Sequence, residues 1–228
     1  MFDFLFSAET RRRKSLESTA EGPVKQYLSV PLPDLKSDIH VVPLLALDFE
    51  TSGLKPSKDC ILSVGYVAVN GGEISLSTAC HQLIKSSEAL TEESVVIHKI
   101  TDDASAAGES IEAVIGNLLQ ALAGKVMVAH NAKIETTFLA QACKKLYGVS
   151  PYFPAIDTML IAKRWLERRN KEIAQGDLRL FNLRKQYGLP MYQAHNALSD
   201  AIATAELLQA QIAHMDSDRK LPLKQFIK

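Results

Sequence analysis

The segment Leu44–Glu50, LLALDFE, constrains the fold more than any other stretch of this sequence. Side chains alternate across a β-strand, so Leu44 and Leu45 point to opposite faces, and both faces are apolar where the segment begins. Such a strand is expected to be buried in the core. Two carboxylates, Asp48 and Glu50, interrupt the apolar pattern near its end, which is unusual for a buried strand.

The rest of the chain supplies further strands and then helices. Strand patterns cover residues 61–69, 74–84 and 125–129, with a hairpin signal, NGG, at 70–72. Helix-period patterns cover residues 111–122, 133–146, 158–169, 178–187 and 198–215. Three strands in a meander, followed by strands that alternate with helices, predict an α/β fold in which helices flank a mixed sheet.

The two ends of the chain differ from the middle. Residues 1–40 combine a basic run, Arg11–Lys14, with scattered prolines, so we expect an N-terminal extension with a short helix and a polyproline-like stretch. The compact domain is predicted at 41–215, and 216–228 is expected to be a mobile C-terminal tail. The extension is a candidate for docking on this domain or on a protein partner.

Charge and cysteine content indicate how this chain could bind a partner and in which cellular compartment it is expected. The 26 basic and 26 acidic side chains give no formal net charge, so nucleic acid would bind only through a local site or a bound cation. Three widely spaced cysteines indicate a reducing compartment. The apolar segment MFDFLFSA is broken by Asp3 and is too short to span a bilayer, so we expect a cytoplasmic protein with no membrane partner.

Buried acids mark a candidate site. Asp48 and Glu50 share one face of the predicted strand, roughly 7 Å apart along it, and like charges this close need a cation or a proton between them. Glu135 falls on the apolar face of the helix predicted at 133–146, beside Phe138. No Lys or Arg shares that face, so Glu135 also needs a partner.

The last predicted helix adds a further acid and a histidine. Asp200 falls near its first turn, Asn196 is a candidate N-cap, and His195 comes directly before Asn196. Carboxylates from three separate segments suit hard divalent cations, Mg²⁺ or Mn²⁺, better than zinc. Such sites often hold two ions about 3.5–4 Å apart and displace groups at phosphorus, with a base such as His195 activating the attacking water.

Each residue also has a structural interpretation. Asp48 and Glu50 could end a strand in solvent, and Glu135 could form a salt bridge. His195 could be a capping or core histidine. Their occurrence together favours the metal site.

Other polar residues near these segments favour structural roles. Asp157 is expected to cap the helix that begins at Thr158, although a supporting role behind the site is the alternative. His130 is as consistent with a satisfied histidine at a strand end as with a site residue. The basic cluster 163–171 around Trp165 is more typical of a solvated helix face than of phosphate contacts.

Three segments resemble the motifs of the DEDDh superfamily of 3′–5′ exonucleases, which includes the proofreading epsilon subunit of bacterial DNA polymerase III. They are LDFETSGL at 47–54, VAHNAKIETTFL at 128–139 and HNALSDA at 195–201. VIHKIT at 96–101, with Lys99 in place of the family's glycine, and AIDTMLIAKR at 155–164 resemble two further recurring segments. The likeness covers about 44–210 and keeps the family order.

This resemblance implies an RNase H-like fold with a mixed five-stranded sheet, and hydrolysis from a free 3′ end that releases nucleoside 5′-monophosphates. It implies that Asp48 bridges two Mg²⁺ or Mn²⁺ ions and that Glu50 and Asp200 complete the tighter site. Glu135 would hold the looser ion, and His195 would be the general base. The residues implied to border the terminal nucleotide are Thr51, Gly53, Leu54, His98 and Asn131.

One residue departs from the family pattern. The second motif normally has aspartate after an aromatic residue, whereas this chain has Ile134 and then Glu135. The extra methylene moves the carboxylate by roughly 1.5 Å. A longer side chain would reach the looser ion directly or displace one water, so we expect an active enzyme with a shifted metal preference, toward Mn²⁺.

Two other functions stay open from the sequence. The first is a non-catalytic module that binds nucleic acid or a partner, for which the Glu135 departure is the only support. The second is a metal phosphoesterase for dinucleotides or small nucleotides, which the zero net charge allows. DNA and RNA are equally open as substrates, because that choice depends on the space around the 2′ position.

Overall fold

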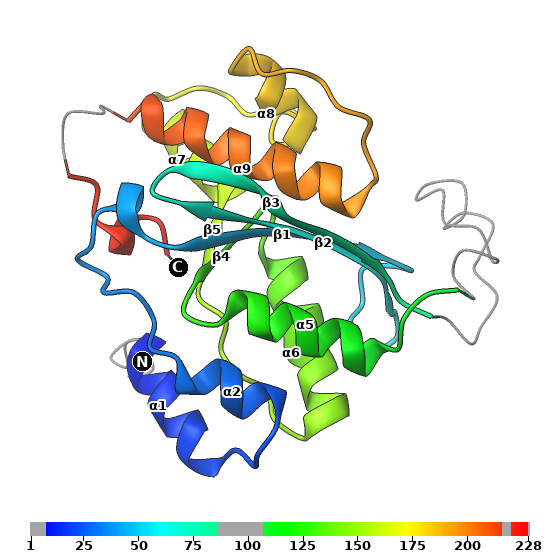
Figure 1. Cartoon of the computed structure of the whole chain (residues 1–228). Helices are drawn as coiled ribbons and strands as arrows, with labels where there is room; N and C mark the ends of the chain where they lie inside the picture. Colours follow the sequence, from blue (N-terminus) through cyan, green and yellow to red (C-terminus); the bar gives the residue numbers. More distant parts are fainter. Residues whose placement is uncertain (1–7, 86–106, 216–219, 228) are drawn as a thin grey trace.

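The centre of the molecule is a five-stranded sheet of order β3-β2-β1-β4-β5 (Figure 1). The computed structural model describes residues 8–85, 107–215 and 220–227. The strands are β1 (Leu44–Thr51), β2 (Ile61–Asn70), β3 (Glu73–Leu83), β4 (Val126–Ala129) and β5 (Ala155–Asp157). β1 to β3 form an antiparallel meander, whereas β4 and β5 continue the sheet parallel to β1. The predicted mixed α/β sheet is confirmed.

Helices cover both faces of the sheet (Figure 1). One face carries α5 (Ile111–Leu122) and α6 (Lys133–Tyr147). The other carries α7 (Thr158–Glu167), α8 (Leu180–Gln186) and α9 (Ala197–Ala213). α9 packs on β1 and β2, and α8 packs on α9. Every predicted helix is present, and its bounds shift by at most a few residues at the ends.

β1 separates two hydrophobic cores, as its apolar faces predicted. Leu45 and Leu47 pack into the core that contains α5 and α6, and Leu44 and Ala46 pack into the core that contains α9. None of the four side chains is more than 3% exposed. The sheet thereby holds the end of β1, with its acids, in a fixed position.

The N-terminal residues contain two helices, α1 (Ala8–Ser18) and α2 (Pro23–Ser29). Tyr27 and Leu28 of α2 belong to the core beside α5. Arg12 of α1 donates to the carbonyl of Leu28 and pairs with Glu9 at 2.6 Å. The expectation of one short helix and a polyproline-like stretch therefore missed α2, which forms because its apolar face is buried. The domain boundary at 40/41 stays a prediction.

Residues 220–227 return to the body of the molecule. Leu221, Leu223 and Phe226 are buried. Leu223 begins the short helix η3 (Leu223–Gln225), and Phe226 directly follows it. The N–H of Ile39, which begins the short helix η2 (Ile39–Val41), donates to the carbonyl of Leu221 at 2.9 Å. The expectation of a mobile tail is wrong for these residues, because three apolar side chains anchor them. Among the described residues, no helix combines the length and apolar character that crossing a bilayer requires.

Candidate active site

Three acids from two distant segments meet at the end of β1. One carboxylate oxygen each from Asp48, Glu50 and Asp200 lie within 4.8 Å of one another. Asp48 and Glu50 come from the same face of β1, and Asp200 comes from the first turn of α9. The predicted convergence of these three side chains is confirmed, whereas their catalytic roles stay predictions.

The start of α9 is fixed by a cap and by a close approach to the sheet. Asn196 is the N-cap, and its side chain accepts from the N–H of Ser199 at 3.0 Å, as predicted. Gly65 of β2 pairs with Asp48 of β1. An added Cβ on Gly65 would collide with the backbone of Ala197, so only glycine lets α9 begin this close to β2. This approach carries Asp200 to Asp48.

Glu135 is buried beside this cluster but is not one of the three grouped acids. Its side chain is 2% exposed, and its Oε2 atom has no hydrogen-bond partner within the described part of the chain. The charge of Glu135 raises the pKa of the Asp48 carboxyl. Glu135 also lies near Asp157, the carboxylate at the end of β5.

Burial and neighbouring carboxylates raise the pKa values of Asp48, Glu135 and Asp200. Burial, and then the charges of Glu135, Glu50 and Asp200, raise the pKa of Asp48 well above its usual range. Burial and Asp157 raise the pKa of Glu135 to about 8. Burial and Glu50 raise the pKa of Asp200 to about 6, although a hydrogen bond from His195 opposes this. A divalent cation would relieve this repulsion.

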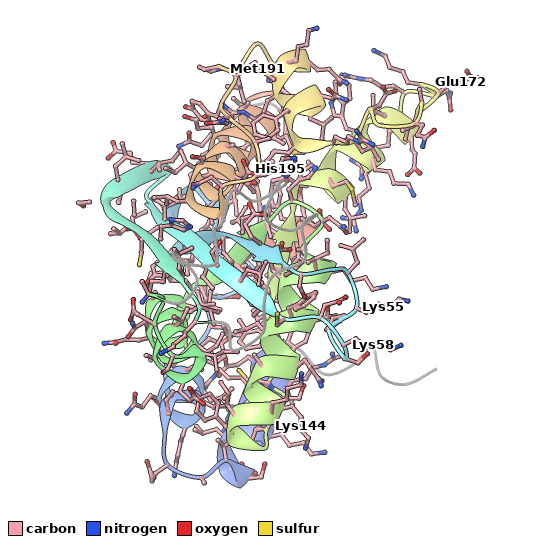
Figure 2. The ribbon with its side chains drawn as sticks, turned by 90° about the vertical axis from the view of Figure 1, so that its right-hand side faces the viewer. Lys55, Lys58, Lys144, Glu172, Met191 and His195 are labelled. Carbon is pink, nitrogen blue, oxygen red and sulfur yellow. The ribbon has the colours of Figure 1, made fainter. Side chains whose placement is uncertain are left out.

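His195 is exposed and lies just before α9 (Figure 2). Its backbone adopts a left-handed conformation, φ 68°, which is uncommon for a residue other than glycine. Its N–H donates to Oδ2 of Asp200 at 3.0 Å. This bond ties the backbone of the predicted base to one of the grouped acids.

A buried arginine holds the segment that leads to His195. Arg184 of α8 is fully buried and donates to the carbonyls of Ala203 at 2.7 Å and Pro190 at 2.6 Å. It also pairs with Glu206 of α9 at 2.7 Å, and Tyr192 donates to the same carboxylate at 2.8 Å. The Arg184 guanidinium lies 4.7 Å from the centre of the Tyr192 ring. These contacts join α8, α9 and the segment between them.

The last residue of β1 and the loop after it include three of the residues predicted to border the terminal nucleotide: Thr51, Gly53 and Leu54. The Thr51 hydroxyl donates to the carbonyl of Gly53 at 2.8 Å. An added Cβ on Gly53 would collide with the carboxylate of Asp59, which accepts from the N–H of Lys55 at 2.6 Å. Leu54 is 77% exposed. His98, the fourth such residue, lies outside the described residues.

The fifth, Asn131, lies in the turn between β4 and α6, with φ 65°. Asp157 caps α7 as predicted, and it also accepts from the N–H groups of Asn131 at 3.1 Å and Ala132 at 3.2 Å. His130 bonds Thr158 through Nδ1 and the carbonyl of Leu178 through Nε2, both at 2.8 Å. It is the satisfied strand-end histidine that the sequence allowed.

A cavity of about 810 Å³ opens beside the acids. Its lining includes Asp48, Asp200 and His195, together with Asn131 and the loop between α7 and α8. Figure 2 shows that Glu172, on that loop, and Met191 lie at the same end of the molecule as His195. Lys55 and Lys58 project from the loop after β1 (Figure 2). The volume is sufficient for a nucleotide-sized ligand.

The family model for exonucleases of the RNase T type matches residues 45–208. The chain belongs to the DEDDh 3′–5′ exonuclease family. This DEDDh chain is 36% identical to the PolC-type DNA polymerase III of Thermotoga maritima over 163 residues, which are 72% of the chain but 11% of that polymerase. It is 30% identical over 177 residues to the DNA polymerase III epsilon subunit of Treponema pallidum, covering 76% of this chain and 78% of that subunit.

A solved DEDDh structure shares the fold. The nuclease domain of 3′hExo, solved with bound rAMP, superposes with a TM-score of 0.65 at 15% identity over 78% of this chain and 96% of that domain. At this identity the likeness establishes the fold alone. The RNase H-like mixed sheet predicted for this DEDDh chain is therefore confirmed.

Several residues that build the site were missed from the sequence. Gly65 and Arg184 act through distant packing that no local pattern reveals. His81 of β3 pairs with Gly65, which pairs with Asp48, so these residues form one row across the sheet. Burial lowers the pKa of His81, and Glu50 opposes that shift, so this imidazole lies within electrostatic reach of Glu50.

Proposed function

We propose that this chain hydrolyses single-stranded nucleic acid from the 3′ end and releases nucleoside 5′-monophosphates. The observation that carries the proposal is the convergence of Asp48, Glu50 and Asp200 within 4.8 Å. A cavity beside them gives a nucleotide access to the acids. Membership of the exonuclease family supports the same reaction.

The donor set fits hard divalent cations. Asp48, Glu50 and Asp200 offer only carboxylate oxygens, and the buried Oδ1 atom of Asp200 has no hydrogen-bond partner among the described residues. These three acids would hold Mg²⁺ or Mn²⁺, and Glu135 would contribute to a second, looser position. Two bound ions would supply Lewis-acid stabilisation of the charge that develops on the scissile phosphate.

His195 would accept the proton of the attacking water. Its side chain is exposed to the cavity that the acids line, and a neutral imidazole is an effective proton acceptor near neutral pH. Its N–H bond to Asp200 keeps it close to the grouped acids while Arg184 and Tyr192 restrain the segment before it. This arrangement restricts the base to the reacting side of the phosphate.

The terminal nucleotide would lie between the end of β1 with its following loop and the turn after β4. Thr51, Gly53 and Leu54 do not line the cavity beside the acids, but they would form one wall once a nucleotide is bound, and the exposed Leu54 side chain would pack on the terminal base. Asn131 lines the cavity together with Asp48 and Asp200. Because the acids engage the phosphate and not the base edges, little sequence preference is expected.

A metal-dependent assay tests the proposal. A 5′-labelled single strand is incubated with Mg²⁺ or Mn²⁺ and with wild type or Asp48→Asn, and the products are separated by length. Wild type should shorten the strand from its 3′ end, and the variant should lose activity by on the order of 10³-fold or more. Metal-independent turnover, or an active Asp48→Asn variant, would overturn the proposal.

Substrate length separates an exonuclease from a phosphoesterase for small nucleotides. Turnover of a dinucleotide, a long single strand and a duplex with frayed ends is compared under the same conditions. The proposal expects the long single strand to be cleaved at least as efficiently as the dinucleotide. A wide margin in favour of the dinucleotide would assign the site to small substrates.

A further inference from the structure

The geometry points to Arg179 as the residue that binds the phosphate one linkage upstream, on the 5′ side, of the scissile phosphate. This inference rests on the proposed exonuclease function and adds a specificity-determining residue to it. Arg179 immediately precedes α8 and is exposed. No feature of the sequence had singled it out.

Arg179 is the single Lys or Arg among the described residues that line the cavity with Asp48, Asp200 and His195. The grouped acids make this cavity strongly negative, so a polyanionic strand needs compensating positive charge within it. Bound divalent ions would neutralise the scissile phosphate but not the next one. A guanidinium fits that second phosphate, since it can donate two parallel hydrogen bonds to phosphate oxygens.

The side chain of Arg179 has no structural task in the described part of the chain. It does not cap α8, and it forms no ion pair or hydrogen bond there. By contrast, Arg12 and Arg184 are both buried and form contacts that hold helices together. A solvent-exposed arginine that faces an acid-lined cavity without pairing is available for a ligand anion.

The backbone around Arg179 is held in place. Its N–H donates to the carbonyl of Gly176 at 2.9 Å, and the Asn182 side chain donates to the same carbonyl at 2.9 Å. The carbonyl of Leu178, the preceding residue, bonds His130 at 2.8 Å. His130 directly follows β4, so the loop is anchored to the sheet beside the acids. A fixed backbone lowers the entropy cost of engaging a phosphate.

The test removes the positive charge of Arg179 in the protein and, separately, the negative charge of the upstream phosphate in the substrate. Three substrates are used: the p-nitrophenyl ester of thymidine 5′-monophosphate, a thymidine trinucleotide, and the same trinucleotide with its upstream phosphate replaced by an uncharged methylphosphonate. Wild type, Arg179→Ala and the control Lys185→Ala are compared by kcat and KM. Lys185 carries the same charge on the neighbouring helix turn but does not line the cavity.

Wild type should show a KM roughly tenfold higher for the methylphosphonate than for the natural trinucleotide. Arg179→Ala should raise KM for the natural trinucleotide by a similar factor and should no longer distinguish the two. Turnover of the ester, which has no upstream phosphate, should be unchanged in Arg179→Ala, and Lys185→Ala should behave as wild type.

The outcomes distinguish this inference from the proposed function. If wild type hydrolyses the ester but Arg179→Ala keeps the full discrimination, the Arg179 contact is wrong and the exonuclease proposal stands. An equal loss in Lys185→Ala would assign the effect to general charge and also overturn the contact. If wild type hydrolyses none of the three substrates, the proposed function fails and the inference fails with it.

Discussion

Gly65 of β2 lies opposite Asp48 of β1, and its missing side chain is what allows α9 to begin against the sheet. The backbone of Ala197 occupies the space that a Cβ on Gly65 would fill. Three residues further along α9 is Asp200, which shares the acid cluster with Asp48. The position of one glycine therefore sets the distance between two acids from opposite ends of the domain.

Gly65→Ala should lower both stability and activity. The added methyl group forces α9 away from β2, which should cost about 1–3 kcal/mol in the free energy of unfolding. Hydrolysis should fall at least tenfold even below the melting temperature, because Asp200 moves with α9. Gly116→Ala on α5 is the matched control, since its added Cβ meets only the Pro23 ring, at 3.9 Å. Wild-type activity in Gly65→Ala would show that the approach of α9 does not set the site.

Glu135→Asp should change the preference between metal ions more than it changes the maximal rate. Shortening the side chain by one methylene withdraws the buried carboxylate from the position beside Asp48. We expect the wild type to favour Mn²⁺ and Glu135→Asp to shift toward Mg²⁺. The ratio of the Mn²⁺ and Mg²⁺ rates on one single strand measures the effect. An unchanged ratio would mean that Glu135 does not contact an ion.

The metal-free protein should lose stability as pH rises from about 4 to 8. Folding raises the pKa of Asp200 to about 6 and of Glu135 to about 8, from unfolded values of about 3.9 and 4.3. The folded state therefore binds more protons than the unfolded state in this range, so the stability present below pH 4 is lost as pH passes the folded pKa values.

Thermal melts in chelator across this pH range check that prediction. The melting temperature should fall by several degrees toward pH 8, and millimolar Mn²⁺ should restore it, because a cation neutralises the acids. Asp48→Asn should flatten the pH dependence, since it removes one of the repelling charges. A metal-free protein that becomes more stable between pH 5 and 8 would contradict the electrostatic account.

Arg184→Ala should loosen the segment that carries His195. Removing the buried guanidinium breaks its bonds to Pro190 and Ala203 and its pair with Glu206, at a cost of about 3 kcal/mol in the free energy of unfolding. Well below the melting temperature, kcat should fall by roughly tenfold with little change in KM. The exposed Lys185→Ala on the same helix should change neither quantity. A stability loss without any fall in kcat would give Arg184 a purely structural role.

Local sequence pattern predicted most elements of this fold but missed those that depend on distant packing. The apolar faces of β1 and the amphipathic period of α5 were readable because each spans several residues. β5 has three residues, too few to show a period, and it was not placed. α2 forms because Tyr27 and Leu28 are buried beside α5, a contact that no local pattern encodes.

The candidate site also contains residues that local sequence pattern revealed and residues that depend on distant packing. Asp48 and Glu50 were identified because acids on the apolar face of a strand are locally unusual, and Asp200 was identified from its place in the first turn of a helix, close after His195. The cap at Asn196 was predictable because asparagine is a preferred N-cap residue. The sequence around Arg184 does not distinguish it from an ordinary polar residue on a short helix. The positions of His81 and Gly65 beside the acids depend on the register of β1, β2 and β3. Register is a property of the assembled sheet.

Calorimetric titration of Mn²⁺ into the chelator-treated protein, with thymidine 5′-monophosphate present, tests the acid cluster most directly. Wild type and Asp48→Asn are titrated under identical conditions at pH 8. The account predicts saturable Mn²⁺ uptake by wild type and its loss, or at least a tenfold weakening, in Asp48→Asn. No uptake by wild type, or equal uptake by both proteins, would contradict it.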